Sequence, residues 1–203
     1  MVGHRCNICI EKDLPIIKWF QDGLVLRTPY CQISFYKKFA RLNVWRKLWY
    51  VKTEKKPYIL ITNPYRDRRF FYYTYEGELM QVDIFEENDK PVVSKCFDNG
   101  GVYRFVDFVY PWCHHLFAIC DANKEYVILE CYEGTLISNI IPDVDDEILC
   151  QTSHPEFPLI VLATNRGELH CVSIVKPTNP KIIARLRIQR TPLDFVKFSL
   201  SGR

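Results

Sequence analysis

Cysteine and histidine residues at the start of the chain have the spacing of half a zinc site. Cys6 and Cys9 form a C-x-x-C pair, and His4 precedes them by two residues. The second half of such a site is missing, because no other C-x-x-C or H-x-x-x-H pattern occurs in the sequence. Cys113, His114 and His115 could supply ligands across the fold. An ordinary strand with two thiols is the simpler interpretation, and we predict no metal and no cofactor.

Two further groups could do chemistry but lack the right geometry. Cys113, His114 and His115 are adjacent, and adjacent residues on a strand point to opposite sides, so they cannot form a nucleophile–base pair with one another. The acidic cluster Asp143, Asp145, Asp146 and Glu147 lacks the turn glycine of a calcium loop and reads as a solvated loop. Glycine-rich phosphate loops and the Gly-x-Ser-x-Gly motif are absent. We therefore predict that the chain is not an enzyme and has no catalytic residues.

One basic stretch, residues 37–56, stands out in charge. It holds a single acidic residue, Glu54, and interleaves Trp45, Trp49 and Tyr50 with its cations. Basic residues beside aromatic ones can bind nucleic acid or an acidic protein surface, and they can also guard the exposed edge of an outermost strand. A protein partner is favoured over nucleic acid. The candidate partner-binding residues are Lys37, Lys38, Arg41, Arg46, Lys47, Lys52, Lys55 and Lys56.

The composition of the whole chain is that of an ordinary globular protein. Its 203 residues carry a net charge of +3, which is too small to indicate a polyanion partner by itself. Most of the nine cysteines sit in apolar runs, where a thiol acts as a small hydrophobe, so we expect reduced thiols in the cytosol. The N-terminus lacks an apolar signal region and no run of about 18 apolar residues occurs, so we expect no membrane partner.

The elements that must position these residues are short strands. Between Glu147 and Arg190, four apolar β-branched runs alternate with segments rich in Pro, Asn and Gly, which favours a four-stranded antiparallel meander. The same order of signals recurs upstream, in units that begin near Leu14, Tyr58, Tyr103, Glu147 and Leu193.

The spacing of these units is 44 to 46 residues, as the positions of their first residues show. A period of about 40–45 residues with four strands per unit is typical of β-propeller blades. An all-β sandwich with evenly spaced strands is the alternative. We predict an all-β propeller over residues 1–203, with blades at about 12–56, 57–97, 102–142 and 146–190 and the start of a fifth at 192–203.

No unit carries a Gly-His or Trp-Asp dipeptide, so the repeat would be a degenerate WD type. A closed ring needs at least four complete blades to hide its edge strands, and the fifth unit holds only a first strand. We therefore expect an incomplete ring in a partial chain. Alternatively, residues 1–9 could complete the open blade by strand exchange.

The residues from Glu147 to Arg203 resemble a propeller blade of the cilia- and flagella-associated WD-repeat proteins. The resemblance is carried by the Thr-Asn-Arg-Gly turn at 164–167, by Glu168–Ile174 and by Asn179-Pro180-Lys181 before a basic last strand. The stretches Tyr103–Ile141 and Cys31–Lys52 fit preceding blades.

The resemblance implies a non-catalytic scaffold of the axonemal tether that links inner-arm dynein to doublet microtubules. Its partners would be a paralogous WD-repeat tether subunit, a dynein heavy chain and tubulin, and its location the axoneme of a cilium or flagellum. The alternative is a propeller adaptor in another cytoplasmic protein or RNA complex.

Overall fold

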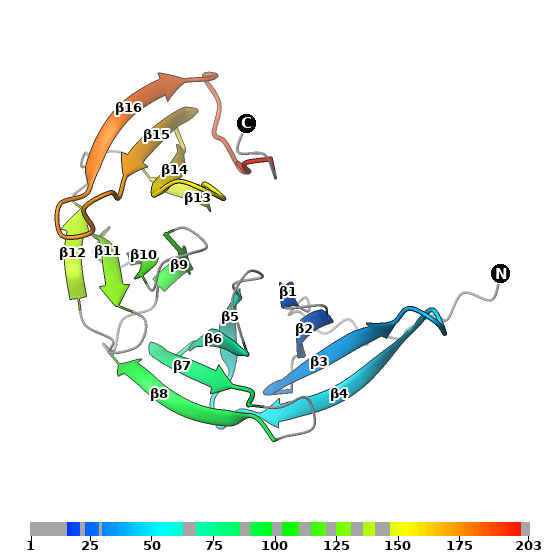
Figure 1. Cartoon of the computed structure of the whole chain (residues 1–203). Coiled ribbons are helices and arrows are strands. Elements are labelled where there is room, and N and C mark those ends of the chain that lie inside the picture. Colours follow the sequence, from blue (N-terminus) through cyan, green and yellow to red (C-terminus); the bar gives the residue numbers. More distant parts are fainter. Residues whose placement is uncertain are drawn as a thin grey trace.

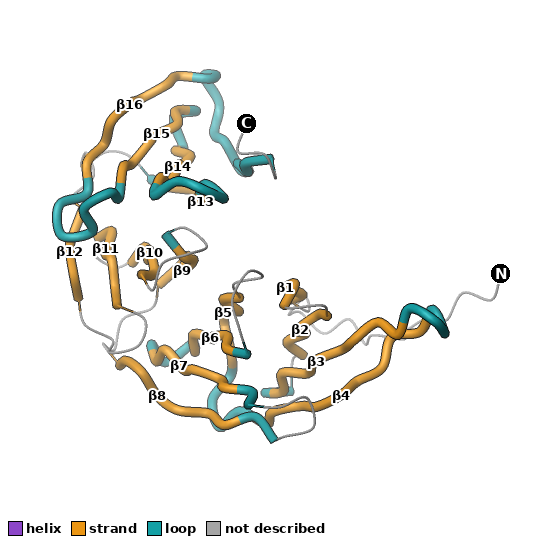
Figure 2. Tube along the Cα trace, viewed as in Figure 1, coloured by secondary structure: helices purple, strands orange, loops and turns teal. Residues whose placement is uncertain are grey.

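The computed structural model describes ten segments of the chain: residues 16–20, 23–28, 30–62, 68–85, 90–98, 103–109, 115–120, 125–130, 136–140 and 147–199. These residues form sixteen strands and no helix (Figure 2). Accordingly, the described segments contain no helix long and apolar enough to cross a membrane.

The strands form four antiparallel sheets, each built from four strands that are consecutive in the sequence. Blade 1 consists of β1 (Ile16–Phe20), β2 (Gly23–Thr28), β3 (Gln32–Phe39) and β4 (Val44–Lys52). Blade 2 consists of β5 (Pro57–Thr62), β6 (Arg69–Thr74), β7 (Glu78–Asp83) and β8 (Val92–Asp98). Blade 3 consists of β9 (Tyr103–Phe108), β10 (His115–Cys120), β11 (Glu125–Glu130) and β12 (Leu136–Ile140). Blade 4 consists of β13 (Ile148–Ser153), β14 (Leu159–Thr164), β15 (Glu168–Ser173) and β16 (Lys181–Arg187).

The four sheets stand side by side in an open arc (Figure 1). The first strands β1, β5, β9 and β13 lie innermost and contact one another in succession, and the fourth strands lie on the outside of the arc. This arrangement is that of an incomplete β-propeller, so the predicted fold class is confirmed. The sandwich alternative is wrong, because a sandwich packs two sheets face to face whereas here each sheet packs only beside its neighbours.

The hydrophobic core is divided into three clusters, one at each junction between neighbouring blades. In β2 alternate residues are buried, as expected of a strand with one face against the next blade. In β6 five consecutive residues are buried, because its two faces belong to two different clusters. Between blades 1 and 2 the Trp49 ring stacks between those of Phe35 and Phe70, with centroids 5.1 and 6.0 Å apart. Phe71, Leu79 and Val106 share the next cluster, and Ile128, Ile148 and Leu162 share the last.

Two blades repeat the same turn between their second and third strands. Thr74 and Thr164 are both fully buried, and the hydroxyl of each accepts a hydrogen bond from the backbone amide four residues later, at 3.1 and 3.2 Å. The third residue after each threonine is a glycine with positive φ, 92° at Gly77 and 76° at Gly167. Equivalent positions of two blades therefore make the same hydrogen bond, as expected of the repeat predicted from the sequence.

The segment that follows β16 contains no strand up to residue 199, and it returns to the inside of the arc. Ile188 N donates to Gly167 O at 3.0 Å, and Leu193 O accepts from the Cys150 thiol at 3.6 Å. Further along, the ring of Phe198 packs on that of His154 with centroids 4.8 Å apart. Residues 193–198 thus run beside β13, on the side of blade 4 away from blade 3.

Candidate partner-binding surface

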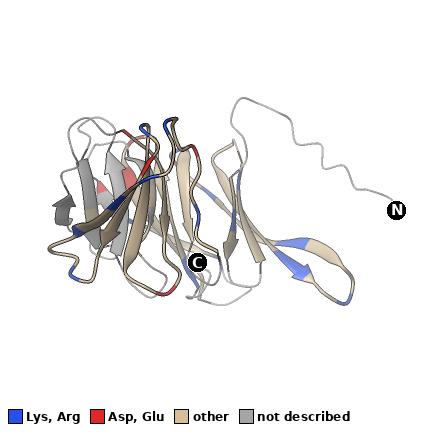
Figure 3. Cartoon of the chain, turned by 90° about the horizontal axis from the view of Figure 1, so that it is seen from above, with Lys and Arg blue, Asp and Glu red and all other residues tan. Residues whose placement is uncertain are grey.

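The outer hairpin of blade 1, β3–β4, projects beyond the sheet that carries it. Its strands have eight and nine residues, whereas β7–β8 and β15–β16 have six and seven. The last residue pair that includes β2 is Gly23–Lys37, so Lys38–Trp45 and Phe39–Val44 pair without support from β2. Figure 3 shows this hairpin extending away from the rest of the arc, with basic residues along it.

A short turn closes the hairpin at residues 40–43. Leu42 N donates to Phe39 O at 3.1 Å, and Asn43 N donates to Ala40 O at 3.3 Å. Asn43 adopts a left-handed φ of 49°, a conformation that asparagine tolerates better than branched residues do. The turn holds the exposed Leu42 at the tip.

Five of the eight predicted partner-binding residues lie in the projecting part of this hairpin, residues 37–47. Two of their cations rest on aromatic rings: Arg46 lies over Phe39 at 5.5 Å from the ring centre, and Lys47 lies over Tyr50 at 5.2 Å. These contacts hold the charges close to apolar surface while leaving them exposed to solvent. The hairpin residues are Lys37, Lys38, Arg41, Arg46 and Lys47.

The remaining three predicted residues lie elsewhere. Lys52 ends β4, and Lys55 and Lys56 lie in the connection to blade 2. The Lys55 amine is 2.8 Å from Glu78 Oε1, and the Lys56 amine lies over the Tyr75 ring at 5.2 Å. The basic stretch is therefore continuous in sequence but divided in space, and two of its cations are engaged by blade 2.

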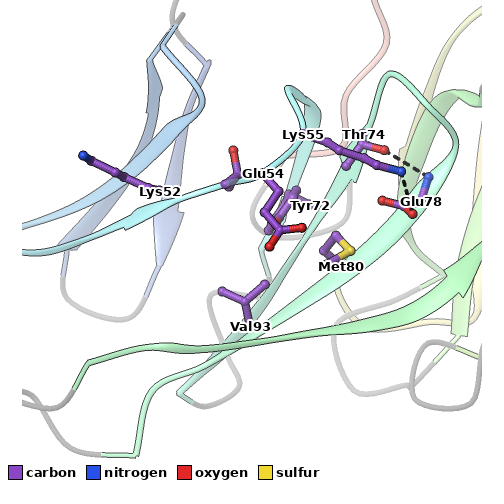
Figure 4. Close-up of a pocket in the computed structure, with 9 residues that line it drawn as sticks. Lys52, Glu54, Lys55, Tyr72, Thr74, Glu78, Met80 and Val93 are labelled. Carbon is purple, nitrogen blue, oxygen red and sulfur yellow. Dashed lines mark hydrogen bonds and ion pairs between the residues drawn. The ribbon is translucent and has the colours of Figure 1, made fainter.

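A pocket of about 200 Å³ opens between blades 1 and 2, lined by Lys52, Lys55, Tyr72 and Glu78 among others (Figure 4). Glu78 is buried, and both Lys55 and Lys95 reach its Oε1, at 2.8 and 3.4 Å. The hydrogen bond to Glu78 raises the pKa of Lys55. Burial, assisted by the charges of Glu54 and Glu78, raises the pKa of Tyr72 to about 12. The buried Glu78 carboxylate of this pocket is thus paired with two lysines.

Several residues singled out in the sequence lie outside the described part of the chain. They are His4, Cys6, Cys9, Cys113, His114, Asp143, Asp145 and Asp146; of His115 only the backbone, at the start of β10, is described. Over the described segments, no three His, Cys, Asp or Glu side chains gather in a way that could hold a metal ion. The prediction of no metal and no catalytic residues stays a prediction.

We did not predict from the sequence that β1 contributes to the surface around the hairpin. The exposed Trp19 ring of β1 lies 6.3 Å from that of Trp45 on β4, centroid to centroid. They are 26 positions apart in sequence, and β2 and β3 lie between their strands in the sheet. The available signal was the pair Ile17 and Trp19, two large apolar residues on one face of a strand whose opposite face also carries apolar residues, Ile16 and Phe20.

Similarity to solved structures supports the fold. No protein-family profile and no curated protein matches the sequence. The chain is similar to Sqt1 of Saccharomyces cerevisiae, with a TM-score of 0.60, 12% identity, and coverage of 85% of this chain and 50% of the other. It is similar to Raptor of Chaetomium thermophilum, with a TM-score of 0.69, 11% identity, and coverage of 91% and 16%. It is also similar to the WD40 repeats of RRP9, with a TM-score of 0.66, 10% identity, and coverage of 90% and 55%.

These similarities show that the chain has a propeller fold like that of the matched structures. The chain spans about half the length, or less, of the structures that it matches. At 10–12% identity the likeness concerns the fold alone.

Proposed function

We propose that this chain is a non-catalytic WD-repeat scaffold of the axonemal tether, which links inner-arm dynein to doublet microtubules in motile cilia and flagella. It would belong to a protein similar to cilia- and flagella-associated protein 43. The partners would be a paralogous tether subunit, a dynein heavy chain and tubulin. The WD40-type fold and the resemblance of residues 147–203 to that family support the proposal.

The single observation that carries a scaffold role is the projecting β3–β4 hairpin. It places five cations on one extension of the arc, and its strands contain no Asp or Glu. A surface of one sign fits a partner of the opposite sign and speeds their encounter. Acidic surfaces of tubulin or dynein have the required charge.

The cellular test is to tag the endogenous full-length protein and image ciliated or sperm cells. We expect signal along the axoneme and an altered beat waveform in cells that lack the protein. Diffuse signal, or a normal waveform after removal, would contradict the tether role and favour a propeller adaptor in another cytoplasmic protein or RNA complex.

The biochemical test reverses the charge of three hairpin residues, Lys38, Arg46 and Lys47, to Glu. We expect binding to axonemal microtubules to weaken by about tenfold at low salt, because exposed ion pairs contribute roughly 0.2–1 kcal/mol each. The wild-type and variant affinities should converge as the salt rises from about 0.1 M to about 1 M, since screening removes the contribution of exposed charges.

The matched control reverses three exposed basic residues on blade 4, Lys176, Lys181 and Arg187, and this blade lies at the other end of the arc. This control should bind like the wild type. Equal weakening in both variants would mean that net charge, and not the hairpin, determines binding.

A further inference from the structure

The pocket between blades 1 and 2 contains two polar side chains that have no partner among the described residues. It is formed by the end of β4, the connection to blade 2 and the face of blade 2 that packs on blade 1, so it does not lie on an end face of the arc (Figure 4). Its volume of about 200 Å³ is below the roughly 300 Å³ at which sites for drug-sized molecules begin. The space therefore suits a single side chain of a partner.

Tyr72 is the first of these polar side chains. The strand register places it opposite Met80, on the face of blade 2 that packs on blade 1. Tyr72 is only 2% exposed, yet it lines the pocket, and its hydroxyl has no hydrogen-bond partner among the described residues. Because a buried tyrosine hydroxyl normally has a partner, this one indicates a ligand atom in the pocket.

Glu54 is the second polar side chain, and its two neighbours in the sequence fix it at the pocket. The backbone amide and the hydroxyl of Thr53 both donate to Cys31 O, at 2.8 and 3.0 Å, which ties the connection to blade 1. Lys55 ties it to blade 2 through the 2.8 Å ion pair with Glu78. Glu54 itself is exposed and has no hydrogen bond or ion pair within the described part of the chain.

The charges around the pocket favour a cation inside it. Both lysines that reach Glu78 are engaged by its carboxylate. The Lys52 side chain points away from the other lining residues in Figure 4. Burial first, and then the charges of Glu54 and Glu78, raise the pKa of Tyr72, so the potential at its hydroxyl is negative. A positively charged ligand is therefore attracted and an anion is repelled.

We propose that this pocket binds the side chain of an arginine from a partner protein. The guanidinium donates two N–H groups to the Glu54 carboxylate and one to the Tyr72 hydroxyl oxygen, as its planar fork of donors allows. Its alkyl stem packs on Met80 and Val93, which supply apolar lining. A lysine ammonium cannot form the bidentate pair with the carboxylate, so it binds more weakly.

This site is separate from the β3–β4 hairpin, and the inference does not rest on the axonemal role. Its test uses the purified full chain labelled with carbon-13 at the methionine methyl groups. The sequence has two methionines, so the NMR signal of Met80 reports on the pocket and that of Met1 is an internal control. The ligands are arginine capped at both backbone ends, and lysine and citrulline capped in the same way.

We expect capped arginine to shift the Met80 signal in a saturable way and to leave the Met1 signal unchanged. Capped citrulline, which has nearly the same shape without the charge, should bind at least tenfold more weakly, and capped lysine about threefold more weakly. Glu54→Gln should weaken arginine binding about tenfold and Tyr72→Phe about threefold, since they remove a charged and a neutral acceptor. Glu76→Gln, which removes an exposed carboxylate of blade 2 that does not line the pocket, should bind like the wild type.

Several outcomes would overturn the proposal. A Met80 signal that does not respond to capped arginine would exclude this ligand, and citrulline or lysine that binds as tightly as arginine would remove the requirement for a guanidinium. Inorganic phosphate that shifts the Met80 signal at a lower concentration than arginine would indicate an anion site. Equal weakening by Glu54→Gln and Glu76→Gln would mean that net charge determines binding. Unchanged urea midpoints show that the variants fold, so that weaker binding is not a loss of structure.

A short peptide with capped ends, Gly-Ser-Arg-Ser-Gly, distinguishes a protein ligand from a small molecule. We expect the peptide to bind at least as tightly as capped arginine, because a partner protein presents its side chain on a peptide backbone. A peptide that fails to bind where capped arginine binds would overturn the partner protein as the source of the guanidinium. None of these outcomes bears on axonemal location, so the two proposals fail separately.

Discussion

Tyr72 lies in the pocket between blades 1 and 2, where burial and the charges of Glu54 and Glu78 raise its pKa to about 12. Cys96 is half-buried, and burial raises the pKa of its thiol to about 11 from 9.0. Both groups are acids that stay neutral in the folded state at a pH where the unfolded chain has already lost the proton. Stability must therefore fall as the pH rises.

The first prediction concerns this loss of stability at alkaline pH. The free energy of unfolding should fall from about pH 9, where an ordinary thiol begins to ionise, and level off above about pH 12. Tyr72 alone should account for about 2–3 kcal/mol, since two pKa units correspond to that difference. Because pH 11 lies midway between the ordinary pKa and the raised one, Tyr72→Phe should remove about half of this amount, about 1.4 kcal/mol, from the loss that urea titrations measure between pH 8 and pH 11. Tyr30→Phe, at an exposed tyrosine, is the control, and identical losses in both variants would contradict the assignment.

At the scale of single elements, the Thr-x-x-Gly turn connects the second and third strands of blades 2 and 4. Thr164 accepts hydrogen bonds from Arg166 N and Glu168 N, both at 3.2 Å, and a Cβ on Gly167 would lie 2.4 Å from Thr191 O. The turn thus fixes β14 to β15 and also leaves room for the chain that returns after β16.

The second prediction removes the acceptor at this turn. Thr164→Val keeps the shape but removes two part-buried hydrogen bonds, so it should destabilise the chain by about 1–3 kcal/mol. Thr164→Ser restores the hydroxyl and should recover most of the loss. Urea unfolding followed by fluorescence measures both variants. A valine variant as stable as the serine variant would show that water replaces the hydroxyl.

The elements differ in how far the sequence could predict them. The turns at Gly77 and Gly167 were readable because their chemistry is local: a threonine, a glycine and a strand on either side. The sequence could not show that the basic stretch is divided in space. Lys55 is near Lys47 in sequence, but blade 1 ends at Lys52 and the chain then passes to blade 2. The contact between the Trp19 and Trp45 rings depends on the order of the strands in the sheet, and this order cannot be predicted from the residues near either tryptophan.

At the scale of the whole molecule, each blade packs only on its neighbours in the arc. Blade 1 shares a core with blade 2, and blade 4 shares a core with blade 3. Interfaces of this kind make stability a sum of nearest-neighbour terms, as in other repeat architectures. A substitution that destabilises blade 1 should therefore leave the stability of blade 4 unchanged.

The third prediction tests this independence by hydrogen exchange. Trp49→Ala removes a ring stacked between Phe35 and Phe70 and should cost about 3–5 kcal/mol. Amide exchange should accelerate in β1–β8 and stay unchanged in β13–β16. Leu162→Ala, in the cluster between blades 3 and 4, is the mirror control and should affect β13–β16 instead. Uniform acceleration in either variant would indicate one cooperative unit.

The path of residues 193–198 beside β13 has a consequence for the order in which such a chain is built. Cys150, Thr164 and His154 of a finished blade hold this segment by hydrogen bonds and ring contact although it pairs with no sheet of its own. A ribosome releases the N-terminal blades first. Each completed blade can then serve as the template on which the next stretch of emerging chain settles, so that the arc grows blade by blade during translation.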